Sequence, residues 1–236
     1  MHELQCGGCE SCGLWRICLP GRIAAERLRP GRHLRIRKVR FARGKALYRS
    51  GDKVESFYMI RSGCIKEIDD SAGRHDSVIN FVLPGEMLSL HCLGSGFSST
   101  TSIAVEASFA CVVPWGAFNN LCANSPPIAG EFIRLIAKAG IPARDLLILI
   151  RDREAIERVA GFLVNIAGRL QIRGVRSREF RLSMNRDDIA AYLGLRSETV
   201  SRCFTELGRR GLIEVRAKRV QILQPAELRR MREPSA

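Results

Sequence analysis

The sequence predicts an α+β protein with an antiparallel β-roll in its N-terminal half, a long helix after the roll and a winged helix-turn-helix at its C-terminal end. Three observations predict this fold. Short apolar segments alternate with regularly placed glycines from about Arg22 to Trp115, which is typical of antiparallel β structure. Apolar residues recur at intervals of three and four after residues 125–127, which indicates helix. Residues 183–207 have the pattern of two helices joined by a tight turn.

The predicted roll consists of short segments rich in β-branched and aromatic residues. Residues 56–63 and 77–83 have the composition of strands. Basic and apolar residues alternate over residues 35–40, which predicts a strand with one solvated face. The glycines that separate such segments predict turns, and they are Gly44, Gly51, Gly63, Gly73, Gly85 and Gly94.

The helical segment after the roll has an apolar seam that fits two interpretations. The seam is long enough to be a dimer interface, and it equally fits a helix pair packed on its own domain. Gly140 and Pro142 interrupt it, so we expect a kink there or a new helix that begins at Pro142. The seam begins at Ile128. The residues proposed for the interface are Phe132, Leu135, Ile136, Ala139, Leu146, Leu149 and Ile150.

A helix-turn-helix motif follows. Gly194 can adopt the positive φ that the tight turn requires, and Ser197 is predicted to cap the second helix. The first helix is predicted to bury Ile189, Ala190 and Leu193, and the second to bury Val200, Phe204 and Leu207. This pattern is typical of proteins that place the second helix in the major groove of DNA.

The exposed face of that second helix has side chains suited to reading bases. Glu198, Ser201 and Arg202 are three and four positions apart, so they project together. Arg202 suits a guanine, Glu198 suits a cytosine amino group, and Ser201 can approach a neighbouring base. The alternative is an ion pair between Glu198 and Arg202 on a solvated face, but the surrounding motif favours DNA. Arg196 and Thr199 complete the predicted DNA-binding residues of the helix.

Two strand-like stretches, residues 212–215 and 219–222, predict a hairpin wing after the motif. Lys218 at its tip is predicted to hold a phosphate without reading sequence.

The whole chain has 38 Lys and Arg against 24 Asp and Glu, with a pI near 10.0, and such a charge attracts a polyanion. No segment has the apolar length of a membrane span, and no signal peptide is recognisable, so we expect a cytoplasmic protein without a membrane partner.

The cysteines indicate metal or redox chemistry, because nine thiols in a reducing compartment are not a disulfide framework. Cys9, Cys12 and Cys18 have the spacing C-x2-C-x5-C among glycines that let the backbone wrap a metal or cluster. A fourth ligand must come from Cys6, Cys64, Cys92, Cys111, Cys122 or Cys203. Zinc sites usually have a second C-x2-C knuckle, which is missing, so zinc or a thiol/disulfide switch is the alternative to an iron-sulfur cluster.

Nothing in the sequence indicates an enzyme. We find no paired carboxylates, nucleophile elbow or phosphate loop, and His91 beside Cys92 is interpreted as structural.

Five regions carry a family resemblance: CESCGLWRICLP at 9–20, GKALYRSGD at 44–52, IRSG at 60–63 with PGE at 84–86, SFACVVPW at 108–115 and ETVSR at 198–202. Together, from about Cys9 to Ile222, they resemble the CRP/FNR superfamily of bacterial transcription regulators, specifically its FNR-type oxygen sensors. The resemblance implies a cyclic-nucleotide-binding-like roll and a homodimer. It also implies a 4Fe-4S cluster on Cys9, Cys12, Cys18 and Cys111 that oxygen degrades, TTGAT-type palindromic half-sites in double-stranded DNA, and RNA polymerase as a partner.

The predicted domains are a cysteine-rich arm (1–20), a β-roll sensor domain (21–124), a dimerisation helix region (125–155) and a winged helix-turn-helix domain (156–236). Two features depart from the family's pattern. Gly140 and Pro142 lie in the helix whose counterpart forms the dimer seam, and Ala143 stands near the usual place of an acidic residue that weakens the cluster-free dimer. Cyclic-nucleotide sensors of the superfamily bind the phosphate with an Arg-Ser pair, whereas residues 94–101 lack a cation, so we expect no cyclic nucleotide here.

Overall fold

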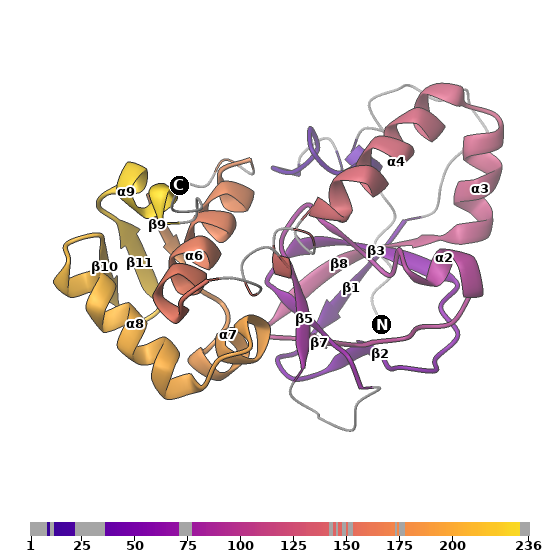
Figure 1. Ribbon diagram of the computed structural model, residues 1–236. Coiled ribbons are helices and arrows are strands. Elements are labelled where there is room, and N and C mark those ends of the chain that lie inside the picture. Colours follow the sequence, from indigo (N-terminus) through magenta and orange to yellow (C-terminus); the bar gives the residue numbers. More distant parts are fainter. Residues whose placement is uncertain are drawn as a thin grey trace. The chain divides into compact units, whose positions relative to one another are not determined.

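The computed structural model describes residues 9, 12–21, 36–70, 77–141, 144, 146–147, 150, 153–172, 174 and 178–231 (Figure 1). The chain divides into two compact units, of which the first contains residues 1–75 and 81–141 and the second contains residues 76–80 and 142–236. None of the helices in the described ranges combines the length and the apolar character that crossing a bilayer requires.

Two four-stranded sheets have the orders β1-β8-β3-β6 and β2-β7-β4-β5, and their strands belong to the first unit except for β5, whose first three residues fall in the second unit's share of the chain. Their strands are β1 (Arg37–Phe41), β2 (Ala46–Tyr48), β3 (Ser56–Ser62), β4 (Ile65–Ile68), β5 (Val78–Val82), β6 (Met87–Leu88), β7 (Thr101–Ala104) and β8 (Ser108–Pro114). The paired strands run antiparallel, which confirms the predicted roll. The strands predicted at residues 56–63 and 77–83 are β3 and β5.

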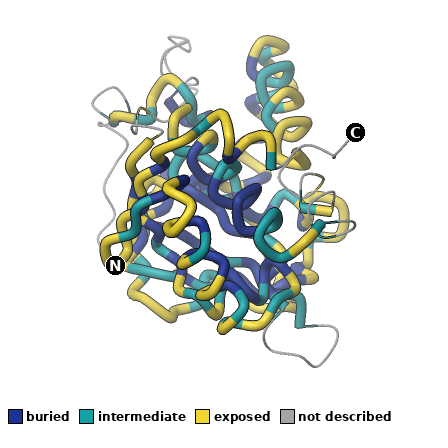
Figure 2. Tube along the Cα trace, turned by 60° about the vertical axis from the view of Figure 1, so that its left-hand side comes forward, coloured by how far each residue is buried: buried dark blue, intermediate teal, exposed yellow. Residues whose placement is uncertain are grey.

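Two apolar cores stabilise this unit, one on each face of the sheet that contains β3. Successive side chains of a strand point to opposite faces. Phe57 and Met59 therefore join the core that also includes Trp115 and Phe118, whereas Ile60 joins the core between the sheets, with Tyr58 packed against it. Figure 2 shows the buried segments in the interior of the molecule and the exposed ones around them.

Three helices belong to this unit: α2 (Cys92–Ser95), α3 (Trp115–Ala123) and α4 (Pro126–Ala139). Helices α3 and α4 lie side by side in Figure 1 and contribute Phe118, Leu121 and Ile128 to the core beneath the first sheet. Helix α4 ends directly before Gly140, as the interruption of the seam predicts. Pro142 and Ala143 lie outside the described residues.

The second unit contains α6 (Ala155–Gln171), β9 (Glu179–Arg181), α7 (Arg186–Leu193), α8 (Ser197–Arg209), β10 (Ile213–Arg216), β11 (Arg219–Ile222) and α9 (Pro225–Arg230). Its sheet has the order β10-β11-β9, so the predicted winged helix-turn-helix is confirmed. Gly194 has φ 63° in the turn between α7 and α8. The predicted cap is wrong: Arg196 is the N-cap of α8, because its carbonyl accepts the first helical hydrogen bond, from the Val200 N–H at 3.0 Å.

Candidate cluster site and nucleic-acid interface

Short main-chain hydrogen bonds shape the arm. The Cys12 N–H donates to the Cys9 carbonyl (3.1 Å), the Trp15 N–H donates to the Cys12 carbonyl (2.9 Å), and the Cys18 N–H donates to the Leu14 carbonyl (2.9 Å). These turns fold the arm back on itself, so that Cys9, Cys12 and Cys18 lie on the same pocket. Leu19 then anchors the arm, since only 1% of it is exposed and it belongs to the core beneath α3 and α4.

Cys111 lies in the middle of β8, at the centre of the first sheet. Its register partners are Lys38 on β1 and Met59 on β3. Directly opposed residues of antiparallel strands project from the same face. Lys38, Met59 and Cys111 therefore stand side by side on one face of the sheet.

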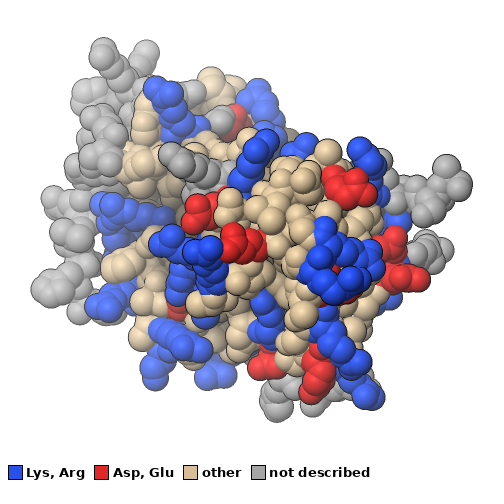
Figure 3. Space-filling model, turned by 90° about the vertical axis from the view of Figure 1, so that its left-hand side faces the viewer, with Lys and Arg blue, Asp and Glu red and all other residues tan. Residues whose placement is uncertain are grey.

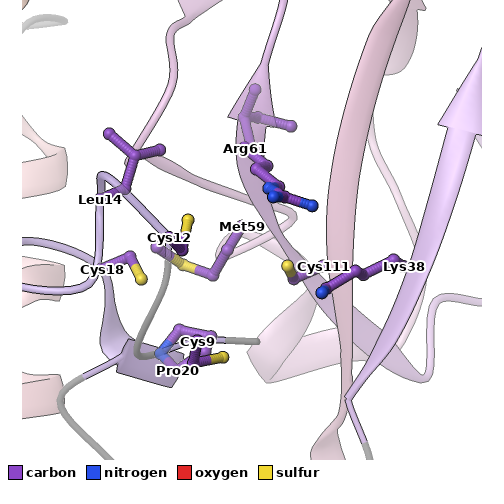
Figure 4. Close-up of a pocket in the computed structure, with 10 residues that line it drawn as sticks. Cys9, Cys12, Leu14, Cys18, Pro20, Lys38, Met59, Arg61 and Cys111 are labelled. Carbon is purple, nitrogen blue, oxygen red and sulfur yellow. The ribbon is translucent and has the colours of Figure 1, made fainter. Parts of the chain in front are cut away.

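The arm and this face of the sheet enclose a pocket that four cysteines line (Figure 4). Cys9, Cys12 and Cys18 come from the arm, and Cys111 comes from β8. The remaining lining residues are Leu14, Pro20, Lys38, Met59, Ile60 and Arg61. Cys9 and Cys111 are only 7% and 9% exposed. The structure thus places all four ligands that the resemblance implies at one pocket, although they come from opposite ends of the first unit's sequence.

The other candidate cysteines do not line this pocket. Burial raises the pKa of the Cys92, Cys122 and Cys203 thiols, and a raised pKa disfavours the thiolate that binds metal. Cys64 is fully buried, and Cys6 lies outside the described residues. The eight described cysteines are not joined to one another by disulfides. Within the described ranges, no group of three or more His, Cys, Asp or Glu side chains is close enough together to hold a metal ion.

The recognition face of α8 is exposed as predicted. Glu198, Ser201 and Arg202 are exposed on one side of the helix, and within the described chain no ion pair joins Glu198 to Arg202. Thr205, which the sequence reasoning missed, is exposed one turn further along, and its hydroxyl donates to the Ser201 carbonyl (3.2 Å). The signal for Thr205 was its spacing of four from Ser201. Arg196 is also exposed, and Thr199 is half-buried.

Contacts with neighbouring elements hold α7, and α8 packs against it. The Asn185 side chain caps α7 by accepting from the Asp188 N–H (2.7 Å), and Arg158 of α6 donates to the Leu193 carbonyl at the other end of α7 (3.3 Å). The Arg186 guanidinium lies 3.4 Å from the centre of the Phe204 ring. Val200, Phe204 and Leu207 are buried, so α8 turns its apolar side to the unit and its polar side to solvent.

Basic side chains lie at the C-terminal end of α8 and in the wing. Hydrogen bonds from Arg209 and Arg210 lower the pKa of Glu206 to about 2, so Glu206 is ionised and neutralises part of their charge. Lys218 lies in the turn of the β10-β11 wing, where its ammonium donates to the Ser183 carbonyl (3.1 Å). Figure 3 shows the side of the molecule that lies on the left in Figure 1. Many Lys and Arg side chains are exposed on it, and fewer Asp and Glu side chains lie among them.

The apolar seam of α4 is divided between two environments. Phe132 and Leu135 pack on the core of their own unit, and the Phe132 ring lies 4.7 Å from the Phe118 ring. Ile133 and Ile136, in contrast, are 66% and 38% exposed. Among the other predicted interface residues, Ala139 is exposed, Leu146 and Ile150 are half-buried, and Leu149 lies outside the described residues.

The interior of the roll holds a network of polar side chains. The Tyr48 hydroxyl donates to Glu67 (3.2 Å), and burial, followed by the Glu67 charge, raises the pKa of Tyr48. His91 Nε2 lies 3.1 Å from the Ser98 hydroxyl. These bonds agree with the interpretation of His91 as structural.

Comparisons with known proteins give a consistent result. Residues 38–125 match the family described as cyclic nucleotide-binding domain, and residues 157–231 match the Crp-like helix-turn-helix domain. The chain is 30% identical over 226 residues to the fumarate and nitrate reduction regulatory proteins of Escherichia coli strain K12 and Salmonella typhimurium, covering 94% of this chain and 90% of each relative.

Solved structures show the same fold. FixK2 from Bradyrhizobium japonicum has a TM-score of 0.77 at 23% identity, over 86% of this chain and 100% of that one. A CooA mutant from Carboxydothermus hydrogenoformans has a TM-score of 0.67 at 16% identity, over 84% of this chain and 88% of that one. At these identities the likeness concerns the fold alone.

Proposed function

The chain belongs to the CRP/FNR family and is an FNR-like DNA-binding transcription regulator, and from this premise we propose that it is an oxygen-responsive homodimer controlled by a 4Fe-4S cluster. The relatives are regulators and not enzymes. The proposed cluster ligands are Cys9, Cys12, Cys18 and Cys111. The proposed target is a palindromic operator with TTGAT-type half-sites.

One observation carries the proposal: three arm thiols and the thiol of Cys111 line a single pocket. The donor set fits an iron-sulfur cluster, because all four donors are sulfur and much of the remaining wall is apolar. The Gly21 N–H also donates to the Cys18 sulfur (3.3 Å), and hydrogen bonds to the ligand sulfurs are a usual feature of such sites. When bound, a cluster supplies a redox-active centre that oxidants destroy.

The arm offers a physical route from this pocket to the dimer interface. Cys18 is adjacent to Leu19, and Leu19 belongs to the core on which α4 packs through Phe132. In the proposed mechanism the arm stays anchored while its three thiols are bound, and Leu19 then completes the support of α4. The neighbouring surface of α4, with Ile133 and Ile136, is exposed in the single chain and can contact a second copy of the chain.

DNA reading is assigned to α8. Arg202 is proposed to donate two hydrogen bonds to a guanine, Glu198 to accept from a cytosine and Ser201 to contact a neighbouring base. Lys218 is proposed to hold a phosphate. Two copies related by a twofold axis would present their helices to half-sites about 34 Å apart. RNA polymerase is the further proposed partner, and cyclic nucleotides have no proposed role.

Metal analysis of protein purified without oxygen tests the cluster. We expect about four iron and four sulfide per chain, and Cys111→Ser should lose most of both. Cys122→Ser is the matched control, because Cys122 is a partly buried thiol of α3 outside the pocket, and it should retain the cluster. A colourless wild-type protein with stoichiometric zinc would support the alternative regulator and overturn this proposal, as would undiminished iron in Cys111→Ser.

A further inference from the structure

Two cationic side chains line the cysteine pocket without a role in ligation. Lys38 projects from β1 as the direct neighbour of Cys111, and Arg61 projects from the end of β3, two residues beyond Met59. In Figure 4 both cationic groups lie on the Cys111 side of the pocket, across from Cys12 and Cys18 of the arm. Neither Lys38 nor Arg61 forms an ion pair with any residue in the described ranges.

A cluster at this site would create a need for positive charge. Four thiolates carry more negative charge than an iron-sulfur core neutralises, so the loaded site is a net anion. Cys9 and Cys111 are more than nine-tenths buried, and Leu14 and Met59 form an apolar part of the wall. A buried charge is costly unless a charge of opposite sign or hydrogen-bond donors lie close to it. Of the lining residues, only Lys38 and Arg61 can supply a positive charge.

We propose that Lys38 and Arg61 are the charge partners of the cluster and shift its reduction equilibrium toward the reduced form. The inference rests on the proposed function, since it requires a cluster on these cysteines. Reduction adds one electron to the cluster from an added low-potential reductant, and no bond or proton is exchanged. The electron makes the site more negative, so nearby cations stabilise the reduced form more than the oxidised form.

The test is an anoxic redox titration of the loaded, full-length protein, followed by electron paramagnetic resonance. Lys38→Met retains most of the length of the side chain and removes its charge. We expect it to make the one-electron reduction about tenfold less favourable, which corresponds to about 59 mV. Arg61→Gln should shift the equilibrium in the same direction, and the double variant should shift it further.

Two variants separate charge from structure. Lys38→Arg keeps the charge and should leave the midpoint potential unchanged. Arg37→Gln removes a charge from the adjacent position of β1, which points to the opposite face, toward Tyr58, and it should also leave the potential unchanged. A second readout is the rate at which an iron chelator removes the cluster without oxygen, and Lys38→Met should raise this rate.

The outcomes distinguish this inference from the proposed function. Equal midpoint potentials in loaded wild type and Lys38→Met would overturn the inference and leave the cluster in place. If Lys38→Met cannot retain a cluster while Lys38→Arg can, charge is required and the inference stands. If both variants fail to retain it, the position acts through packing and the inference fails. A wild type that binds no cluster would overturn the proposed function and this inference with it.

Discussion

Gly21 packs directly against the backbone of Trp15 in the arm. A Cβ at this residue would lie 2.3 Å from the Trp15 carbonyl oxygen and 2.5 Å from the Trp15 Cα, which is too close for backbone atoms to accommodate. The N–H of the same residue donates to the Cys18 sulfur. An added side chain would therefore push the arm away from the position in which Cys18 faces the pocket.

We predict that Gly21→Ala lowers the iron content of protein purified without oxygen, while Gly13→Ala does not. Gly13 lies in the same arm, but a Cβ at that residue would have no other atom within 4 Å. Iron analysis together with thermal unfolding measures both effects, and Tm should stay close to that of the wild type in both variants. Full iron loading of Gly21→Ala would show that the arm binds in another conformation.

The residues proposed to read bases give a second prediction at this scale. Arg202→Ala should cost about 1 to 3 kcal/mol of DNA binding at one position of each half-site and relax discrimination there. Lys218→Ala should weaken binding to all sequences alike, because a phosphate contact carries no sequence information. Fluorescence anisotropy with operators substituted at each position separates the two. A uniform loss for Arg202→Ala would contradict its assignment to a base.

At the scale of elements, α4 packs on the core through Phe132 and Leu135 and exposes Ile133 and Ile136, for which we propose a role in dimerisation. We predict that Ile133→Glu makes the protein monomeric and leaves each chain folded, because this side chain is 66% exposed in the single chain and its burial would require a second chain. Phe132→Ala is the contrasting variant, since its ring packs on Phe57, Trp115 and Phe118, and it should lower the free energy of unfolding. Light scattering and thermal unfolding measure the two properties. If the Ile133→Glu variant remained dimeric, the dimer interface would lie elsewhere on the chain.

The elements that the sequence predicts well are those whose signal is local. Composition located β3 and β5, and the helix-turn-helix followed from residue types at fixed spacing around Gly194. Helix α3 was missed because no loop separates it from β8: the strand ends at Pro114 and the helix begins at Trp115. Periodicity identified the apolar seam of α4, but it does not show which residues of the seam pack on the same chain and which are left for a second copy.

Contacts that depend on strand register could not be predicted at all. The C-x2-C-x5-C spacing identified the arm cysteines, and the resemblance selected Cys111. That Lys38 stands opposite Cys111 depends on how β1 pairs with β8, which only the assembled sheet determines. The burial of Leu19 beneath α3 and α4 could not be predicted either, because the composition of the arm does not indicate which part of the fold it packs against.

At the scale of the whole molecule, the net charge of +14 attracts any DNA. Binding through phosphates is independent of sequence and falls steeply with salt. Affinity for an operator alone therefore says little about regulation. The informative quantity is the ratio of affinities for operator and scrambled DNA at one salt concentration, since only correctly paired recognition helices raise it.

The most direct test of the account is this affinity ratio, measured for cluster-loaded protein without oxygen and again after exposure to air. For the wild type, the account predicts strong preference for a palindromic operator with TTGAT-type half-sites, and a fall of about 5- to 150-fold after air destroys the cluster. Cys111→Ser should have the low ratio in both conditions. A wild-type ratio that is the same with and without the cluster would contradict the central claim that the cysteine pocket controls DNA reading.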